Sequence, residues 1–396
     1  MTPTSSSPQP PPPPPAPWRN LFLSHLQTME EPEFTLSTLR RATAIESSSG
    51  ISSNRRRSSV LGGPPPYVPR TRICICRGLW ASLPLHPQNE APRNPPGVYE
   101  SDLLTFTTDA RMDKMAELWE DGGIVDFLDA RNGHGHGHGH GHGHGDPGSP
   151  TTTKVGEELW EEGLARMKGK KKFAGDDAVA RGLRGSGAEN MVANATGDER
   201  FKGSGGGAVV EAVFWARGPR VQWRVRGRAY VLAPDIESSP AGREVMALLK
   251  SRMRRLSSSS SSSSSNPPSP SPPLLSSSPE GKDQEKEEKD KWSFSREITA
   301  HFGNLSPLMR GSFRNPPPGR PVALPVENEG LGLGQRVMDL QDPIARANFR
   351  VVVIVPEEVD QVDLSDREHG RRWIHTYVGG TGQGQGKEWE TVEVWP

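Results

Sequence analysis

Residues 210–232 read VEAVFWARGPRVQWRVRGRAYVL and give the clearest indication of the fold. On both sides of Gly218–Pro219, apolar and polar residues alternate with the period of two that half-buried β-strands show. The Gly-Pro pair is a turn signal, so the stretch predicts a β-hairpin. One face of its second strand is expected to carry Gln222, Arg224, Arg226 and Arg228.

Several other segments resemble strands because they alternate in polarity or are rich in β-branched and aromatic residues. They are 34–38, 73–76, 103–107, 348–355, 371–377 and 388–394. Apolar residues at helical spacing predict helices at 18–26, 111–120 and 243–256, with a weaker signal at 294–302. Strands and helices do not alternate regularly. The pattern therefore favours a mainly β (α+β) fold, an antiparallel sheet or barrel with peripheral helices, over a doubly wound fold.

Composition limits how much of the 396-residue chain can fold. Only 32% of the residues are hydrophobic, and Gly and Pro contribute 43 and 39 residues. Low-complexity segments bury too little apolar surface to offset their ordering entropy. We therefore expect a disordered tail at 1–16 and a single domain over 17–396. Disordered insertions are expected to interrupt that domain at 46–66, 132–206 and 257–291.

Charge and residue usage exclude several classes of protein. Lys and Arg together number 48, as do Asp and Glu, so no bulk charge indicates a nucleic-acid or anionic-membrane partner. No segment is apolar enough for a secretory signal or a membrane span, which leads us to expect a cytoplasmic protein. The Gly-His repeat at 133–145 and the lone Cys74-x-Cys76 pair are weak metal signals, and no metal is expected.

The first stretch that can carry chemistry is PRTRICICRG, residues 69–78. On an extended strand, Arg72, Cys74 and Cys76 point to one face and Ile73, Ile75 and Arg77 to the other. Cations at the two ends of an apolar strand can reach anions at its two edges. The alternative is an ordinary surface arginine on an edge strand, whose stem covers apolar surface while its head stays in water.

The second stretch is LLTFTTDARMDK, residues 103–114, where a strand ending in Thr107 and Thr108 gives way to a helix. Asp109 is expected to cap this helix, with Lys114 close to its first turn. A cation there opposes the helix dipole unless a phosphate binds beside it. The alternative is an ordinary cap with solvated charges.

Two further segments carry weaker signals. Gln222 combines a donor and an acceptor, as needed to read the edge of a heterocycle, although a charged strand face is more often simply solvated. The segment DREHGRR, residues 366–372, places Arg367, His369 and Arg371 on one side if it is extended. These groups repel one another unless an anion lies between them. The alternative is a basic loop before the last strands.

In this order the motifs resemble the pyridoxamine 5'-phosphate oxidase family of FMN-binding split barrels, and in particular its plant, fungal and cyanobacterial FMN-binding-domain branch. The family's Arg–strand–Lys signature is matched by residues 72–77, with Arg77 in place of the Lys. Its Thr-rich strand end and following Lys match residues 107–114, its Gln-Val-Arg-Val-x-Gly matches 222–227, and its Arg-x-His-x-Arg matches 367–371.

The resemblance implies an antiparallel Greek-key split β-barrel that binds FMN at the interface of a homodimer. The FMN contacts it implies are Arg72, Ile73, Cys74, Ile75, Thr107, Thr108, Lys114, Gln222 and Arg371. The substrate contacts it implies are Arg77, Arg367 and His369. The chain departs from the family where Gln361–Asp363 replaces Trp-Gln-Gly and where Glu393 replaces an Arg near the C-terminus.

The resemblance favours a flavin-dependent oxidoreductase, with pyridoxamine or pyridoxine 5'-phosphate as the substrate. Two alternatives remain open on the same barrel. One is an NAD(P)H-dependent flavin reductase or another FMN enzyme. The other is a non-catalytic flavin-binding or interaction protein, in which the insertions are the functional parts.

Overall fold

The computed structural model describes residues 14–41, 67–119, 201–256, 291–326, 330–379 and 388–396. The predicted insertion at 46–66 lies outside these ranges, as do nearly all of 132–206 and 257–291. Within the predicted tail, Ala16 is described and is buried, and its N–H donates to Asp102 Oδ2 at 2.9 Å. The predicted boundary at 206 runs past the first residue of a strand, Gly205.

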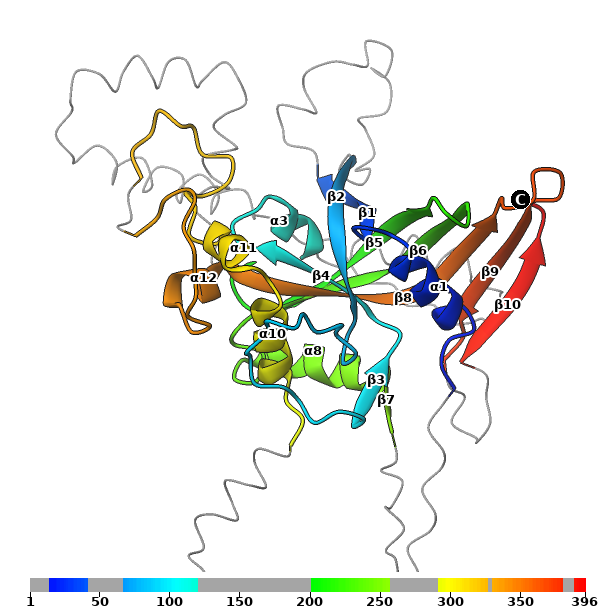
Figure 1. Ribbon diagram of the computed structural model, residues 1–396, viewed down its shortest axis with the longest axis horizontal. Coiled ribbons are helices and arrows are strands. Elements are labelled where there is room, and N and C mark those ends of the chain that lie inside the picture. The colour runs from blue at the N-terminus through cyan, green and yellow to red at the C-terminus, as the bar shows by residue number, and fades with distance from the viewer. Residues whose placement is uncertain (1–13, 42–66, 120–200, 257–290, 327–329, 380–387) are drawn as a thin grey trace, which may run out of the picture. The chain divides into compact units, whose positions relative to one another are not determined.

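Six antiparallel strands close into a barrel (Figure 1). They are β1 (Glu33–Arg41), β2 (Tyr67–Leu79), β4 (Leu104–Asp109), β5 (Gly205–Ala216), β6 (Val221–Leu232) and β8 (Phe349–Asp363). Around the ring the order is β1, β2, β4, β8, β6, β5 and back to β1. Since β5 returns to lie beside β1 after β1, β2 and β4, the connection is a Greek key. The expected antiparallel, mainly β fold is confirmed.

The predicted hairpin is present as β5 and β6. Phe214 pairs with Trp223 and Trp215 with Gln222, so the chain turns between Ala216 and Val221. Gly227 of β6 lies so close to β8 that an added Cβ would be 2.0 Å from the carbonyl oxygen of Val355. A side chain cannot fit there. The register between β6 and β8 shifts at this point, which is where the barrel wall bends.

The sheet extends beyond the barrel along the second half of β8. Residues 349–354 of β8 pair with β4, whereas residues 358–363 pair with β9 (Arg371–Tyr377). A last strand, β10 (Trp389–Val394), pairs with β9. Strand β8 can pair with both β4 and β9 because it has 15 residues, whereas β4 has only 6.

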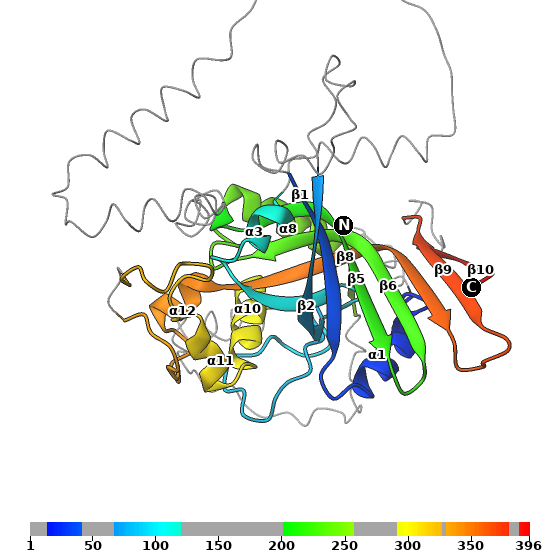
Figure 2. The same ribbon diagram turned by 90° about the horizontal axis from the view of Figure 1, so that it is seen from above.

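Aromatic side chains fill the barrel interior, and a helix adds to this core at each end of β5. At one end, Phe22 of α1 (Arg19–Gln27) lies 5.1 Å from Phe214, measured between ring centroids. At the other, Trp119 follows α3 (Lys114–Leu118) and packs against Gly205. Figures 1 and 2 show α1 and α3 apart along the barrel. Apolar side chains from outside the barrel thus pack near both ends of β5.

A second core lies on the outer face of β8. Val352 and Ile354 point into the barrel, whereas Val351, Val353 and Val355 pack against a layer of helices. Burial on both faces explains why this strand is a continuous apolar run rather than an alternating one. The layer contains α8 (Pro240–Ser251), α10 (Phe294–Gly303), α11 (Pro307–Ser312), α12 (Pro343–Asn348) and the small sheet of β3 (Tyr99–Ser101) and β7 (Met253–Arg255).

A buried ion cluster ties this small sheet to the N-terminal segment. Arg254 of β7 donates from Nη2 to Asp102 Oδ1 at 2.8 Å and from Nε to Glu100 Oε1 at 3.0 Å. Arg19 of α1 forms an ion pair with Asp102 at 3.0 Å. Two arginines thus face two carboxylates, and Asp102 also accepts the N–H of Ala16.

The predicted helix at 111–120 is shorter than expected. It begins at Lys114, with Asp113 at the N-cap position, and Asp109 is instead the last residue of β4. The reason is local: the Asp109 carboxylate accepts the N–H of Arg111 at 2.8 Å and its guanidinium at 2.6 Å, which holds a turn between strand and helix. Asp109 is therefore not the helix cap.

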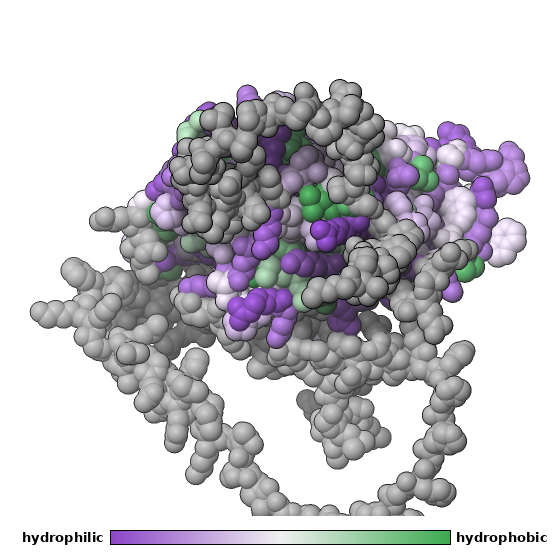
Figure 3. Space-filling view, turned by 90° about the horizontal axis from the view of Figure 1, so that it is seen from below, coloured by the Kyte–Doolittle hydropathy of each residue, from purple (hydrophilic) through white to green (hydrophobic). Residues whose placement is uncertain are grey.

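The exposed surface seen from below is mixed in character (Figure 3). Hydrophobic side chains show in small groups between hydrophilic ones on the part that is coloured. None of the described helices is long and apolar enough to cross a membrane.

Candidate functional site

A polar cluster lies where β1, β2 and α3 meet. Arg72 of β2 donates from Nη1 to the hydroxyl of Thr38 on β1 at 2.9 Å. The guanidinium of Arg72 and the hydroxyl of Thr38 both donate to the same oxygen of Glu117 on α3. The β1–β2 register places Thr38 opposite Arg70 and therefore diagonally next to Arg72. We call Thr38, Arg70, Arg72, Lys114 and Glu117 the Arg72 cluster.

Lys114 is the second cation that the sequence predicted here, and it begins α3 three residues before Glu117. Its Nζ lies 6.0 Å from the centroid of the Phe106 ring. Burial lowers the pKa of Lys114, and the positive charge of Arg72 lowers it further. The neighbouring Cys74 and Glu117 act in the opposite direction. Arg72 and Lys114 are thus close enough to repel each other.

The Arg72 cluster has more positive than negative charge. Arg70 extends a weaker contact to Glu117, with Nε 3.9 Å from Oε1. Three cationic side chains therefore surround one carboxylate. Burial raises the pKa of the nearby Cys74 thiol, which keeps this group neutral at ordinary pH. Guanidinium, ammonium and hydroxyl donors with a surplus of positive charge form a donor set that suits a phosphate.

The family comparison is informative over this part of the chain. Residues 15–131 match the family model described as pyridoxamine 5'-phosphate oxidase, FMN-binding domain. The resemblance is confirmed. The cofactor expected from the sequence, FMN, is the one that this family's description names. The whole of the Arg72 cluster lies inside the matched residues.

Two further comparisons add less. One solved structure, a pyridoxamine 5'-phosphate oxidase-related, FMN binding protein from Nostoc punctiforme PCC 73102, matches over 96% of this chain and 98% of its own. Its sequence identity is 12% and its TM-score 0.40, which is too remote to bear on function. No curated protein matches the chain.

The remaining residues of the predicted β2 site lie on both faces of the strand, as its alternation predicts. Cys74 is buried on the Arg72 side, whereas Ile73 is 69% exposed on the other side. Ile73 lines a groove of about 670 Å³, together with Trp215 of β5 and Glu31 in the segment between α1 and β1. Ile75 is half-buried on the same face as Ile73.

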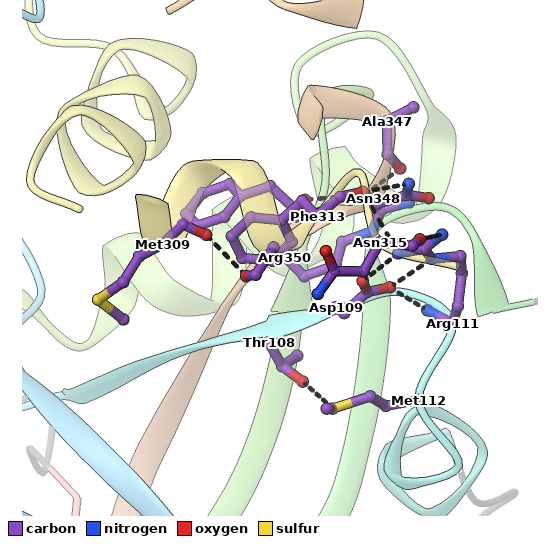
Figure 4. A network of polar contacts seen from close by, with 12 residues as sticks. Thr108, Asp109, Arg111, Met112, Met309, Phe313, Asn315, Ala347, Asn348 and Arg350 are labelled. Atoms are coloured by element: carbon purple, nitrogen blue, oxygen red, sulfur yellow. Dashed lines mark hydrogen bonds and ion pairs between the residues drawn. The ribbon is translucent and has the colours of Figure 1, made fainter. Parts of the chain in front are cut away.

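Thr107 and Thr108 lie at the end of β4 on opposite faces. Thr108 shares the inward face of Phe106 and is buried, and its hydroxyl contacts the sulfur of Met112 at 3.6 Å (Figure 4). Thr107 is half-buried on the outer face. Thr108 is therefore the one of the two that shares a face with the ring beside Lys114.

Arg111, another cation in residues 103–114, has a structural role. Its guanidinium donates to Asp109 and to the carbonyl oxygen of Asn315 at 2.8 Å (Figure 4). Arg350 lies in the same network, donating to the carbonyl oxygens of Ala347 and Phe349. Burial lowers its pKa to about 10, partly offset by Asp235 and Asp109. This network joins β4 to the helical layer.

Arg77 lies on the face of β2 opposite Arg72. Burial lowers the pKa of Arg77, and its buried Nε has no hydrogen-bond partner in the part of the chain that the structure describes. Its charge acts on His301 of α10, whose ring stacks on Trp80 at 5.8 Å and 13°. Burial, and after it the charge of Arg77, lower the pKa of His301 to about 3, so this imidazole is neutral.

Gln222 lies on the outer face of β6, in the row that the sequence predicted. With its amide oriented to match its neighbour, its oxygen accepts from Arg224 Nε at 2.7 Å. Each arginine of the row faces a carboxylate of β8. The pairs are Arg224–Asp360 at 3.6 Å, Arg226–Glu358 at 3.9 Å and Arg228–Glu357 at 3.1 Å. The row is thus neutralised by the neighbouring strand.

Two of the three predicted C-terminal site residues also have acidic partners. Arg371 of β9 is exposed and donates to both carboxylate oxygens of Glu393, at 2.8 and 3.1 Å. His369 lies in the exposed turn before β9, with Nδ1 3.3 Å from Asp366. Arg367 is exposed in the same turn. Across the ranges described above, no hydrogen bond or ion pair joins these residues to Arg77 or to the Arg72 cluster.

Of the predicted cofactor residues, the structure thus brings together Arg72, Lys114 and Cys74. Gln222 and Arg371 lie elsewhere on the same chain. Sequence reasoning did not select Thr38 and Glu117, although two signals were available. Thr38 continues the inward alternation of Phe34 and Leu36, and Glu117 follows Lys114 at helical spacing. Among the described residues, no group of three His, Cys, Asp or Glu is placed to bind a metal.

Proposed function

We propose that this chain binds FMN, with the phosphate held by Arg72 and Lys114, and that it acts as a flavin-dependent oxidoreductase. The observation that carries the proposal is the convergence of these two cations. They come from separate elements, both lie within the residues that match the FMN-binding family, and Arg72 donates to Glu117, whose charge also acts on Lys114.

The residues present fit the phosphate end of FMN. A guanidinium can donate two parallel hydrogen bonds to phosphate oxygens, and Lys114 adds a compact positive charge. Burial disfavours the charged form of Lys114, and a bound anion would offset that penalty. A flavin held here would supply hydride-transfer chemistry, while Arg72 and Lys114 would bind its phosphate and orient it.

We further propose that FMN lies between two copies of the chain, as the family resemblance implies. This arrangement would let Gln222 and Arg371 of a second copy reach the flavin, since within one chain they lie away from Lys114. The proposal predicts a dimer in solution, which sedimentation or light scattering of the FMN-loaded protein can test. A monomer that retains FMN would contradict it.

The first experiment is an absorption spectrum of the purified protein, where an oxidised flavin absorbs at about 450 nm. The Lys114→Met variant is expected to bind FMN at least about tenfold more weakly, since a charge-assisted hydrogen bond is lost. Lys250→Met is the matched control. Lys250 is an exposed lysine that also lies over a phenylalanine ring, 5.7 Å from the centroid of Phe294. Equal losses in both variants, or no flavin binding, would overturn the proposal.

The second experiment identifies the reaction by mixing the FMN-loaded protein with pyridoxamine 5'-phosphate or with NADPH under anaerobic conditions. We propose a vitamin B6 phosphate as the substrate, because the family resemblance implies it and assigns Arg77 to the substrate. Within the described ranges, Arg77 Nε is buried without a hydrogen-bond partner. Bleaching of the flavin by NADPH alone would favour a flavin reductase. Bound flavin that neither compound reduces would favour a non-catalytic flavin-binding protein.

A further inference from the structure

Glu117 occupies the position in the Arg72 cluster where an anion is needed. Its side chain is fully buried, although it belongs to a helix of only five residues at the barrel end. One of its oxygens accepts from both Arg72 and Thr38. Arg72, one of the two cations proposed to hold the flavin phosphate, therefore already faces this carboxylate.

The carboxylate of Glu117 does not use all the hydrogen-bond donors and positive charge around it. Among the described residues, Glu117 Oε1 is buried without a hydrogen-bond partner, and its one ion-pair contact there is Arg70 at 3.9 Å. For Lys114, the described part of the chain provides no hydrogen bond or ion pair, and its Nζ lies over the Phe106 ring. Two arginines thus contact, and Lys114 lies near, a group with one negative charge and two oxygens. A phosphate carries nearly two charges and three free oxygens, which suits these donors better.

From this mismatch we infer that Glu117 is an internal anion that competes with the flavin phosphate for Arg72 and Thr38. The inference rests on the proposed function and adds to it, because it names the residue that limits phosphate affinity. When the phosphate binds, the negative charge of Glu117 either remains beside it and repels it, or leaves Arg72. In both cases part of the binding free energy is lost.

The consequence is specific to the phosphate and not to the flavin ring. Removing the charge of Glu117 should strengthen binding of FMN and leave binding of riboflavin, which has no phosphate, unchanged. Glu117→Gln suits this purpose, because glutamine keeps the length of the side chain and one oxygen that can accept from Arg72 and Thr38.

The experiment measures dissociation constants of FMN and riboflavin for the full chain and its variants. Glu117→Gln is expected to bind FMN about tenfold more tightly than the wild type, with riboflavin unchanged. Glu297→Gln is the matched control, since Glu297 of α10 is another buried glutamate, which accepts from Asn94 Nδ2 at 2.8 Å. That control should leave both constants unchanged. FMN binding that is weaker or unaltered in Glu117→Gln would overturn the inference.

Two additional measurements keep the inference testable if Glu117→Gln does not fold. Glu117→Asp keeps the negative charge but shortens the side chain by one methylene, which moves the carboxylate away from Arg72 and Thr38. FMN should therefore bind this variant more tightly than the wild type, but by a smaller factor than it does Glu117→Gln. In the wild type, competition should keep the preference for FMN over riboflavin below about a hundredfold. A preference of about a thousandfold would contradict the inference.

Failure of the proposed function has a separate signature. If neither flavin binds to any variant, the chain is not a flavoprotein, and titration with inorganic phosphate still reports on Glu117. Phosphate should bind Glu117→Gln more tightly than the wild type. Equal phosphate binding by the two proteins would overturn the inference independently of FMN.

Discussion

Two buried carboxylates, Asp102 and Glu117, each contact arginines from distant parts of the chain, but the ratio of positive to negative groups around them differs. Around Asp102, two arginines face two carboxylates, and Asp102 also accepts an N–H. Around Glu117, three cations face one carboxylate, and one of its oxygens has no hydrogen-bond donor. A closed set of partners indicates a structural role. A surplus of donors indicates a place for something that the chain does not supply.

The largest effect on stability is expected from a substitution that disrupts the balanced cluster around Asp102. Asp102→Asn leaves Arg254 and Arg19 without their shared negative charge in a buried position, and should lower the free energy of unfolding by about 3–5 kcal/mol. Urea unfolding followed by circular dichroism measures the loss. Asp366→Asn, which alters an exposed acid, should leave the unfolding midpoint unchanged. A similar loss in both variants would mean that the Asp102 cluster contributes no more to stability than an exposed acid does.

A smaller effect is expected in the unbalanced cluster, and it can be rescued. Arg72→Met leaves the buried Glu117 without its main partner and should cost about 2–3 kcal/mol. Adding Glu117→Gln to this variant should restore most of that stability, because the uncompensated charge is gone. FMN affinity should stay low in the double variant. Joint recovery of stability and FMN affinity would show that Arg72 has only a structural role.

Acid provides a test of a third kind of buried group, the imidazole of His301, which has no hydrogen-bond partner among the described residues. His301 has a pKa of about 3 in the folded chain and 6.5 as its ordinary value, so between these values the unfolded chain binds a proton that the folded chain excludes. Stability should therefore fall as the pH drops below 6.5, at up to about 1.4 kcal/mol per pH unit, and level off below 3. His301→Phe should flatten this slope in urea unfolding between pH 7 and 4. An unchanged slope would assign the acid sensitivity to other groups, such as His375, whose pKa burial lowers to about 4.

The smallest effect is expected on the outer face of β6. Arg226 and Glu358 are 3.9 Å apart and both well exposed, so their pairing is screened by water and salt. Arg226→Ala should change the free energy of unfolding by no more than about 0.5 kcal/mol and leave FMN binding unaltered. Loss of FMN on this substitution would move the candidate site from β2 to β6.

Local pattern was sufficient to predict much of the fold. The alternation in residues 210–232 gave the hairpin, and the alternation in residues 69–78 correctly separated Arg72 and Cys74 from Ile73. These predictions succeed because strand periodicity depends on neighbours in sequence. The same holds for the placement of Lys114 after a strand end, although the Asp109–Arg111 turn delays the helix by three residues.

Contacts between distant residues could not be derived in this way. Glu117 reaches Thr38 across 79 residues and Arg72 across 45. Strands β3 and β7 pair although they lie far apart in the sequence. Each has only three residues, which is too few to show a periodic pattern. Charge patterns were similarly ambiguous, because the sequence does not show that the arginines of β6 face the acids of β8.

Strand β8 sends alternate side chains into two separate cores, with Ile354 in the barrel and Val353 and Val355 among the helices. Loss of this strand would therefore expose apolar side chains of both cores at once. The barrel and the helical layer should therefore melt as one cooperative unit, and the central amides of β8 should exchange with solvent only when the whole fold is lost.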